Sequence, residues 1–281
     1  MRHLAFMVVR DEADILPQTL DRLLTWVDGL WVFDTGSLDH TPDLLADRAR
    51  ADERLTFLGS EAIAFSHRAK AILFERLRNN FRPGDWICRA DADERYLVHP
   101  PSFLADRTEP HETVVCAQLF DTVLLRRDLA AWQRGDETLA DRTRPIETRR
   151  THHVVNQFPE LRFFRYRRGM RWPGHLMSPR FAGVMADARI PVRHDKWRDP
   201  VQAQWRTILR SAMVPNMAVG GGHWLTQTWQ TEVRRVTHRA VKPWPADGSI
   251  PPVPFAHPHQ PKALRRLAVR LAHGSGAIRL I

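Results

Sequence analysis

The sequence predicts an α/β protein with a mostly parallel sheet, helices on both faces of that sheet, and strands of mixed direction in the second half. Two observations support this prediction. Short apolar runs alternate with amphipathic segments over residues 1–95, and acidic residues follow the ends of several of these runs. This alternation is typical of βαβ units, whose parallel sheets bind ligands beyond the carboxyl ends of the strands.

Four strands and three helices are expected in the first half. The apolar runs predict strands at residues 3–9, 30–33, 54–58 and 85–90. Asp14, Thr41 and Ser66 are interpreted as N-caps of the intervening helices, because short polar side chains can satisfy free N–H groups of a first helical turn. Pro42 follows Thr41, and proline is well tolerated at the first helical position.

After residue 95 the alternation weakens. Strands of mixed direction are expected at 113–119 and 161–166, and a helix at 200–212. Residues 243–261 contain seven prolines, which predicts an extended linker or a strap along the surface. We therefore expect a domain at 1–242, made of a nucleotide-sugar half (1–110) and an acceptor half (111–242), then the linker and a basic amphipathic helix at 262–281.

Composition narrows the class of protein. Of the 281 residues only two are cysteines, Cys88 and Cys116, which is too few for a disulfide scaffold or a four-cysteine zinc site and indicates a reducing compartment. No segment approaches the ~18 consecutive apolar residues of a membrane span. The expected location is therefore the cytoplasm, with peripheral contact at the inner face of the membrane left open.

Charge is distributed unevenly along the chain. Residues 1–110 carry 14 basic and 19 acidic side chains, whereas residues 111–281 carry 28 basic and 13 acidic ones. The basic second half suits a phosphate-bearing ligand, an anionic membrane or a nucleic acid. Only four of the 42 basic residues are lysine, so a genomic bias toward arginine is the alternative explanation.

Acidic side chains gather at the predicted strand ends. Asp11 and Glu12 follow the first strand, Asp34 ends the second, and Asp91 and Asp93 follow the fourth. Carboxylates crowded at one sheet edge repel each other unless cations or hydroxyl groups satisfy them, which indicates a divalent cation and a polyhydroxylated ligand. Asp91 and Asp93 are two residues apart, so we expect their side chains to project to one side and share a cation.

These motifs carry a family resemblance. The segments VRDEADIL (9–16), VFDTGSLDHT (32–41) and DWICRADADE (85–94) resemble, in order and spacing, the bacterial family-2 glycosyltransferases. Shorter similar stretches occur at 162–165, 170–175 and 192–200. The resemblance implies a GT-A (Rossmann-like) fold and transfer of a sugar from a nucleoside diphosphate with inversion at the anomeric carbon.

The same resemblance implies roles for the acidic residues. Asp11 or Glu12, together with Asp34, would contact the base and ribose of the donor, and a helix-capping turn is the alternative for Asp34. Asp91 and Asp93 would hold Mg²⁺ or Mn²⁺ on the diphosphate, with Asp93 as the direct ligand. Asp11 departs from the family, which generally has Asn at this position, and so adds a charge beside the base.

Basic residues and a catalytic base complete the expected site. By the resemblance, Arg68 and Lys70 would face the diphosphate and His194 would be a late metal ligand or diphosphate contact. The alternatives are an exposed helix face for Arg68 and Lys70 and a structural role for His194. The family often places an acidic base shortly after the Trp-x-Gly segment, where this chain has none, so three residues remain as candidate bases: His175, Asp187 and Asp195.

The sequence thus predicts a metal-dependent inverting glycosyltransferase with a nucleotide-sugar donor and an unknown glycan, lipid-linked or small-molecule acceptor. A different class remains as the alternative, namely a non-catalytic protein that keeps the nucleotide-sugar fold and binds polyanions or anionic membranes through its basic half. The chain carries no recognisable nucleic-acid-binding module, which disfavours nucleic acid as a partner.

Overall fold

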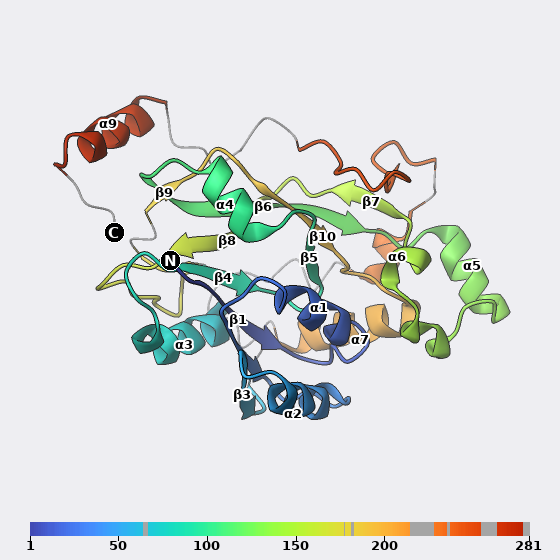
Figure 1. Ribbon diagram of the computed structural model, residues 1–281. Coiled ribbons are helices and arrows are strands. Elements are labelled where there is room, and N and C mark those ends of the chain that lie inside the picture. The colour runs from blue at the N-terminus through green and yellow to red at the C-terminus, as the bar shows by residue number, and fades with distance from the viewer. Residues whose placement is uncertain are drawn as a thin grey trace.

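A computed structural model describes residues 1–63, 67–176, 178–180, 183–213, 228–234, 237–253 and 263–277. Within these residues a single mixed sheet of 11 strands runs through the molecule, with helices around it (Figure 1). One half of the sheet is parallel and the other is mixed. The predicted α/β class is therefore confirmed.

The first half follows the predicted βα alternation. Its parallel strands lie in the order β4-β1-β2-β3. The strands and the helices between them are β1 (His3–Val9), α1 (Leu16–Leu23), β2 (Gly29–Asp34), α2 (Thr41–Ala51), β3 (Leu55–Ser60), α3 (His67–Leu77) and β4 (Trp86–Ala90).

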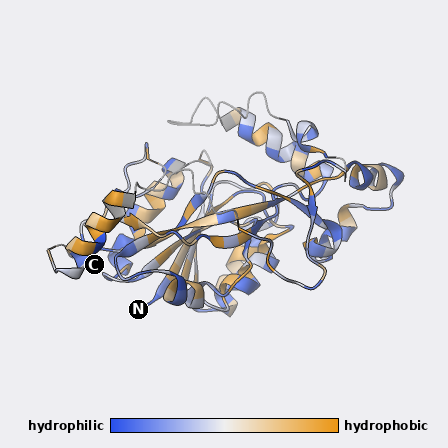
Figure 2. Cartoon of the chain, turned by 90° about the horizontal axis from the view of Figure 1, so that it is seen from above, coloured by the Kyte–Doolittle hydropathy of each residue, from blue (hydrophilic) through white to orange (hydrophobic). Residues whose placement is uncertain are grey.

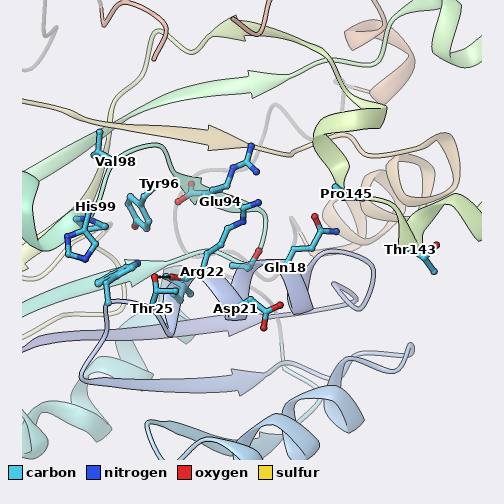
Figure 3. A pocket seen from close by; sticks show the side chains of 15 residues that line it. Gln18, Asp21, Arg22, Thr25, Glu94, Tyr96, Val98, His99, Thr143 and Pro145 are labelled. Carbon is cyan, nitrogen blue, oxygen red and sulfur yellow. Dashed lines mark hydrogen bonds between the residues drawn. The ribbon is translucent and has the colours of Figure 1, made fainter. Parts of the chain in front are cut away.

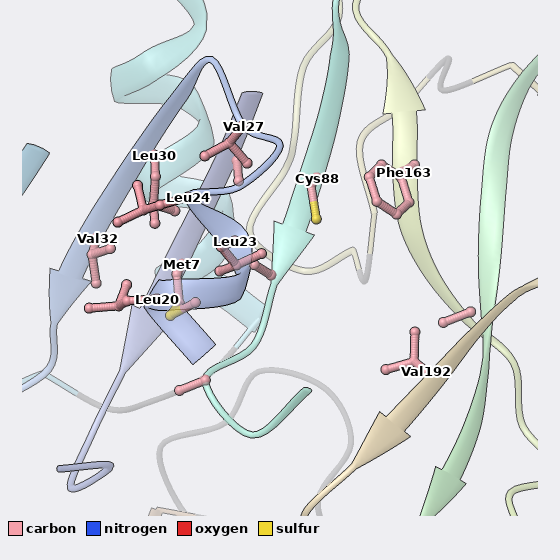
Figure 4. Packing of buried hydrophobic residues seen from close by; sticks show 14 of the residues in the cluster. Met7, Leu20, Leu23, Leu24, Val27, Leu30, Val32, Cys88, Phe163 and Val192 are labelled. Atoms are coloured by element: carbon pink, nitrogen blue, oxygen red, sulfur yellow. The ribbon is translucent and has the colours of Figure 1, made fainter. Parts of the chain in front are cut away.

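The central strand β1 is buried on both faces. Its residues alternate between two hydrophobic clusters, so that Met7 packs with α1 and α2 while Phe6 packs with α3. Figure 4 shows Met7 beneath Leu20 and Leu23 of α1. A strand covered on both faces has no solvent-facing positions, which explains why it is an uninterrupted apolar run in the sequence.

The second half is mixed, as predicted. Strand β8 (Glu160–Arg165) lies antiparallel between β4 and β6 (Glu112–Thr122), and β10 (Ile190–His194) runs parallel to β6 and antiparallel to β5 (Glu94–Tyr96). The remaining elements are β7 (His152–Val155), β9 (Val184–Met185), β11 (Lys242–Pro243), α4 (Pro100–Arg107), α5 (Arg126–Arg134), α6 (Ile146–Arg149), α7 (Pro200–Met213), α8 (Trp229–Glu232) and α9 (Ala263–Gly274).

Two predicted helix caps are wrong. Ile15, and not Asp14, precedes the first residue of α1, and the carboxylate of Asp14 accepts hydrogen bonds from Arg198 at 2.7 and 2.8 Å. Thr41 is already helical, and its hydroxyl accepts the backbone N–H of Glu12 at 2.9 Å. Both side chains bind distant partners instead of their own helices, while the third predicted cap, Ser66, lies outside the described residues.

The beginning of the proline-rich segment lies against the sheet. Strand β11 pairs with β7, the backbone N–H of Trp244 donates to the carbonyl of Thr151, and the indole of Trp244 lies 4.4 Å from the His153 ring between centroids. As far as Trp244, this segment is therefore a strap on the sheet edge. None of the helices in the described ranges is long and apolar enough to cross a membrane.

Candidate functional site

A cavity of about 240 Å³ lies beyond the carboxyl ends of β1 and β2, where the sequence predicts the ligand. Helix α7 closes its other side. The cavity places the first acidic motif against α7, a helix distant in the chain. Its lining residues include Asp11, Glu12, Leu38, Asp39, Val201, Trp205 and Arg206.

Asp11 connects the walls of this cavity. Its backbone has a φ of 54°, in the left-handed region where Asn and Asp are the most tolerated residues after glycine. One carboxylate oxygen accepts the backbone N–H of Leu38 at 2.6 Å, and the other accepts the indole N–H of Trp205 at 3.0 Å. Both carboxylate oxygens of Asp11 therefore act as acceptors, whereas an amide in this place would offer only one.

Glu12, which follows Asp11 in the wall of the same cavity, has a strongly perturbed pKa. Burial raises the pKa of Glu12 to about 7, although the guanidinium of Arg198, 2.8 Å away, acts in the opposite direction. A carboxyl group with this pKa exchanges a proton near neutral pH.

Asp34 serves its own loop in this structure. The fully buried carboxylate accepts the backbone N–H groups of Gly36 and Ser37 at 3.0 and 2.9 Å and the hydroxyl of Ser60 at 2.6 Å. Gly36 has a φ of 87°, and a Cβ there would lie 2.8 Å from the Cα of Ala62, so the turn requires glycine. This geometry corresponds to the turn alternative, and Asp34 does not line the cavity.

The two aspartates after β4 face different partners. Asp91 lies between the Lys70 ammonium at 2.5 Å and the Arg162 guanidinium at 3.0 Å. Burial acts to raise the pKa of Asp91, but these two cations hold it well below its usual range. Lys70 therefore lies beside the motif as expected, whereas Arg68 is exposed on α3.

Asp93 forms a chain with His194 and a residue that the sequence analysis missed. The Nε2 atom of His194 lies 3.3 Å from Asp93 Oδ2, and its Nδ1 lies 2.8 Å from Asp121 Oδ1. The parallel pairing of β10 with β6 aligns His194 with Asp121. Burial opposes protonation, but the two carboxylates raise the pKa of His194 well above its usual value, so this site favours positive charge.

This arrangement suits a divalent cation. A metal-binding histidine usually donates its other ring N–H to a carboxylate, as Asp121 allows here. Neighbouring ligand atoms of an octahedral cation lie about 3 Å apart, close to the separation of His194 Nε2 and Asp93 Oδ2. Arg206 Nη1 lies 2.6 Å from Asp93 Oδ2, so Arg206 and a bound cation would share this oxygen.

The rest of a coordination shell would come from the ligand. Across the parts of the chain that the structure describes, no cluster of three or more His, Cys, Asp or Glu residues could hold a metal ion. Mg²⁺ commonly takes one or two protein ligands together with phosphate oxygens and water. Asp93 and His194 therefore fit a cation that arrives with a diphosphate.

Arg162 binds several carboxylates around the acidic motif that follows β4. Its buried guanidinium donates to Glu94 at 2.6 Å, to Asp91 at 3.0 Å and to Glu160 at 3.0 Å. Arg89 also pairs with Glu160 at 3.0 Å. A buried guanidinium with several carboxylate partners holds their geometry more rigidly than exposed pairs can. Sequence analysis noted residues 162–165 only as a similar stretch.

The three candidate bases are dispersed. Asp195 follows His194, and its buried carboxylate accepts the Nε–H of Arg193 at 2.8 Å. Asp187 is exposed and lines a cavity with Glu112 at the start of β6, about 30 Å along that strand from Asp121. His175 is exposed in a turn. Of the three candidates, only Asp195 adjoins the Asp93–His194 pair, through its backbone N–H, which donates to the Asp93 carbonyl at 2.7 Å, while its carboxylate binds Arg193.

A larger cavity, of about 530 Å³, lies against α1 (Figure 3). Arg22 and Arg95 line it and both pair with Glu147. Trp26 lines it as well, and its ring centroid lies 5.7 Å from that of Tyr96. Glu94 is part of the wall, so this cavity reaches the turn that carries Asp93.

Comparisons with known proteins give limited similarity. No family model matches the chain. A TPR repeat-containing protein of Synechococcus elongatus is 34% identical over 108 residues, which are 38% of this chain and 24% of that relative. The match thus spans about a quarter of the relative's length.

Solved glycosyltransferase structures resemble the chain at the level of fold. The mannosyltransferase PcManGT from Pyrobaculum calidifontis, in complex with GDP-Man and Mn²⁺, is 15% identical with a TM-score of 0.43, covering 76% of this chain and 64% of its own. GalNAc-T7 with UDP, GalNAc and Mn²⁺ is 12% identical with a TM-score of 0.39, covering 71% of this chain and 44% of its own. Similarity of this degree does not indicate an activity. Only the residues of the site can support one.

Proposed function

We propose that the protein is an inverting, metal-dependent glycosyltransferase of the family-2 type with a GT-A domain at residues 1–242. It would move a sugar from a nucleoside diphosphate to an acceptor hydroxyl group. The observation that carries this proposal is the chain Asp93–His194–Asp121 next to a cavity at the carboxyl ends of parallel strands. The family resemblance also supports the proposal, and it is carried by the acidic motifs at 9–16, 32–41 and 85–94.

Different residues around the cavity would bind different parts of the donor. The outer cavity, with Asp11 and Trp205, would bind the nucleoside, while Asp93 and His194 would hold Mg²⁺ or Mn²⁺ on the diphosphate. The cation, when bound, supplies positive charge that stabilises the departing diphosphate. Arg206 lines the cavity and reaches Asp93, so its guanidinium is placed to bind diphosphate oxygens directly.

For the acceptor, we propose a catalytic base and a binding cavity. Inversion requires one displacement, in which a base takes the proton of the acceptor hydroxyl. Among the candidates, Asp195 lies beside His194 and is our choice, provided that the ligand draws Arg193 away from its carboxylate. The cavity against α1 offers aromatic and cationic groups that would contact an acceptor.

Calorimetric titration with a panel of nucleoside diphosphates, with and without Mn²⁺, tests this function. We expect metal-dependent binding of one nucleoside diphosphate and slow hydrolysis of the matching nucleotide sugar. The non-catalytic alternative predicts binding to any polyanion, without nucleotide preference and with a steep loss of affinity as salt rises. That second result would reject the proposal that the protein is an enzyme.

A membrane-facing role for α9 is a second proposal. Leu264, Leu267 and Leu271 lie on one stripe of this helix and are each more than half exposed, so most of the stripe faces water, while Leu267 also lines a cavity with Glu109 and His111. Figure 2 shows hydrophobic (orange) segments on the helix beside the C-terminus, at the edge of the molecule. Basic residues flank the stripe in the sequence, a pattern typical of helices that lie on anionic membranes. Such a position would suit a lipid-linked acceptor.

Deletion of residues 262–281 should therefore reduce sedimentation with anionic liposomes and leave nucleotide binding unchanged. Each basic residue near such a surface contributes about 1 kcal/mol of binding free energy, so the loss should be greatest at low salt. Replacement of Leu264, Leu267 and Leu271 by serine is the matched variant, because it keeps every charge. Equal liposome binding by the intact and truncated chains at low salt would contradict the proposal.

A further inference from the structure

The rim of the donor cavity is apolar, in contrast to its acidic floor. Leu38 is 76% exposed, Val201 is 47% exposed and Trp205 is 39% exposed, and all three line the cavity. Leu38 belongs to the loop between β2 and α2, whereas the other two belong to α7. Large apolar side chains left in water around a cavity mark a surface that a ligand covers.

One carboxylate determines the spacing of this rim. Asp11 accepts the backbone N–H of Leu38 through Oδ1 at 2.6 Å and the indole N–H of Trp205 through Oδ2 at 3.0 Å. The indole is thus held by its edge, which leaves the ring face free to pack. Val201 precedes Trp205 by four residues and therefore lies next to it on the same face of α7.

Arg206, the residue after Trp205 on α7, adjoins the site proposed for the diphosphate of the donor. Arg206 lines the same cavity and contacts Asp93 Oδ2 at 2.6 Å, so the apolar rim adjoins the pair that would hold the diphosphate. A nucleoside diphosphate has the matching layout, with a flat apolar ring at one end and a charged diphosphate at the other. Aromatic side chains bind nucleobases by stacking, with little dependence on the identity of the base.

We infer that Trp205 is the stacking platform for the nucleobase of the donor, that Leu38 covers the base from the loop side, and that Asp11 holds the two walls at a fixed separation. This inference rests on the proposed function. It also explains the acid at position 11, since the indole N–H requires an acceptor that the nitrogen of an asparagine amide could not provide.

Calorimetry on three variants tests the inference. Trp205→Ala should raise the Kd for the preferred nucleoside diphosphate about ten- to hundredfold, whereas Trp205→Phe should keep most of the affinity because it keeps an aromatic face. Both variants should bind pyrophosphate with Mn²⁺ as the wild type does. Ile208→Ala is the matched control, because Ile208 is exposed on α7 but does not line the cavity.

The outcomes separate the two proposals. Failure of the wild type to bind any nucleoside diphosphate would reject the proposed function and this inference with it. Nucleotide binding by the wild type that Trp205→Ala leaves unchanged would overturn the stacking role alone. Equal weakening of nucleoside diphosphate and pyrophosphate by Trp205→Ala would overturn it too, because Trp205 would then act by positioning Arg206. Melting temperatures of the variants confirm that each one is folded.

Discussion

Asp93→Asn is expected to reduce glycosyl transfer by about a hundred- to a thousandfold, since the cation on the diphosphate loses its charged protein ligand. Asparagine has nearly the same shape, and Glu12 and Asp121 still face the Arg206 and His194 cations, so the buried position should tolerate it. The loss should appear mainly as a lower affinity for Mn²⁺ in the presence of nucleoside diphosphate. Steady-state kinetics across a Mn²⁺ titration, with Mn²⁺ binding measured by electron paramagnetic resonance, checks both effects.

Two controls accompany this variant. Asp43→Asn removes an equivalent charge from the exposed surface of α2 and should leave transfer unchanged. Removal of divalent cations from the wild type with EDTA should abolish transfer, and Mn²⁺ should restore it. Full activity of Asp93→Asn in excess EDTA would contradict the metal-dependent mechanism.

Arg162→Met is expected to lower the free energy of unfolding by about 3–5 kcal/mol. The variant keeps the apolar stem but leaves the carboxylates of Asp91, Glu94 and Glu160 without their shared guanidinium. Lys70 and Arg89 still neutralise two of them, so Glu94 carries most of the cost. Urea denaturation followed by circular dichroism measures the change.

A double variant distinguishes this explanation from simple loss of packing. Arg162→Met combined with Glu94→Met removes both members of the buried pair and should recover part of the lost stability, because no charge is then left unpaired at Glu94. Arg168→Met, at an exposed turn position, should change stability by less than about 0.5 kcal/mol. A double variant less stable than Arg162→Met alone would contradict the charge-based explanation.

The parallel half of the fold was predictable because its signal is local. Strands β1, β2 and β4 are buried and therefore mostly apolar, with Arg89 as the charged residue within β4. Strand β10 was predicted only as a short β-like run ending at His194, because it is five residues long, contains a proline and ends in two basic residues. It is a strand because β5 and β6 pair with it, and a single sequence does not contain that information.

Part of the candidate site was predictable for the same reason. Acids that follow parallel strands must collect at one edge, and Asp11, Glu12, Asp91 and Asp93 do so. The residues that complete the site were not predictable, because Asp121 lies within a strand and Arg206 within a helix, and neither has a distinctive sequence motif. Asp121 reaches His194, and Arg206 reaches Asp93, only when β6, β10 and α7 are assembled.

The sequence by itself determined the α/β class, the order of the first seven elements and the edge at which the acids gather, since these follow from hydrophobic periodicity and strand direction. Only the tertiary structure decided the partner of each charge. It paired Asp14 with Arg198, Asp91 with Lys70 and Arg162, and Asp93 with His194 and Arg206. The physical reason is that a charge removed from water must find an opposite charge within a few ångströms, and the register of distant strands and helices determines which one is there.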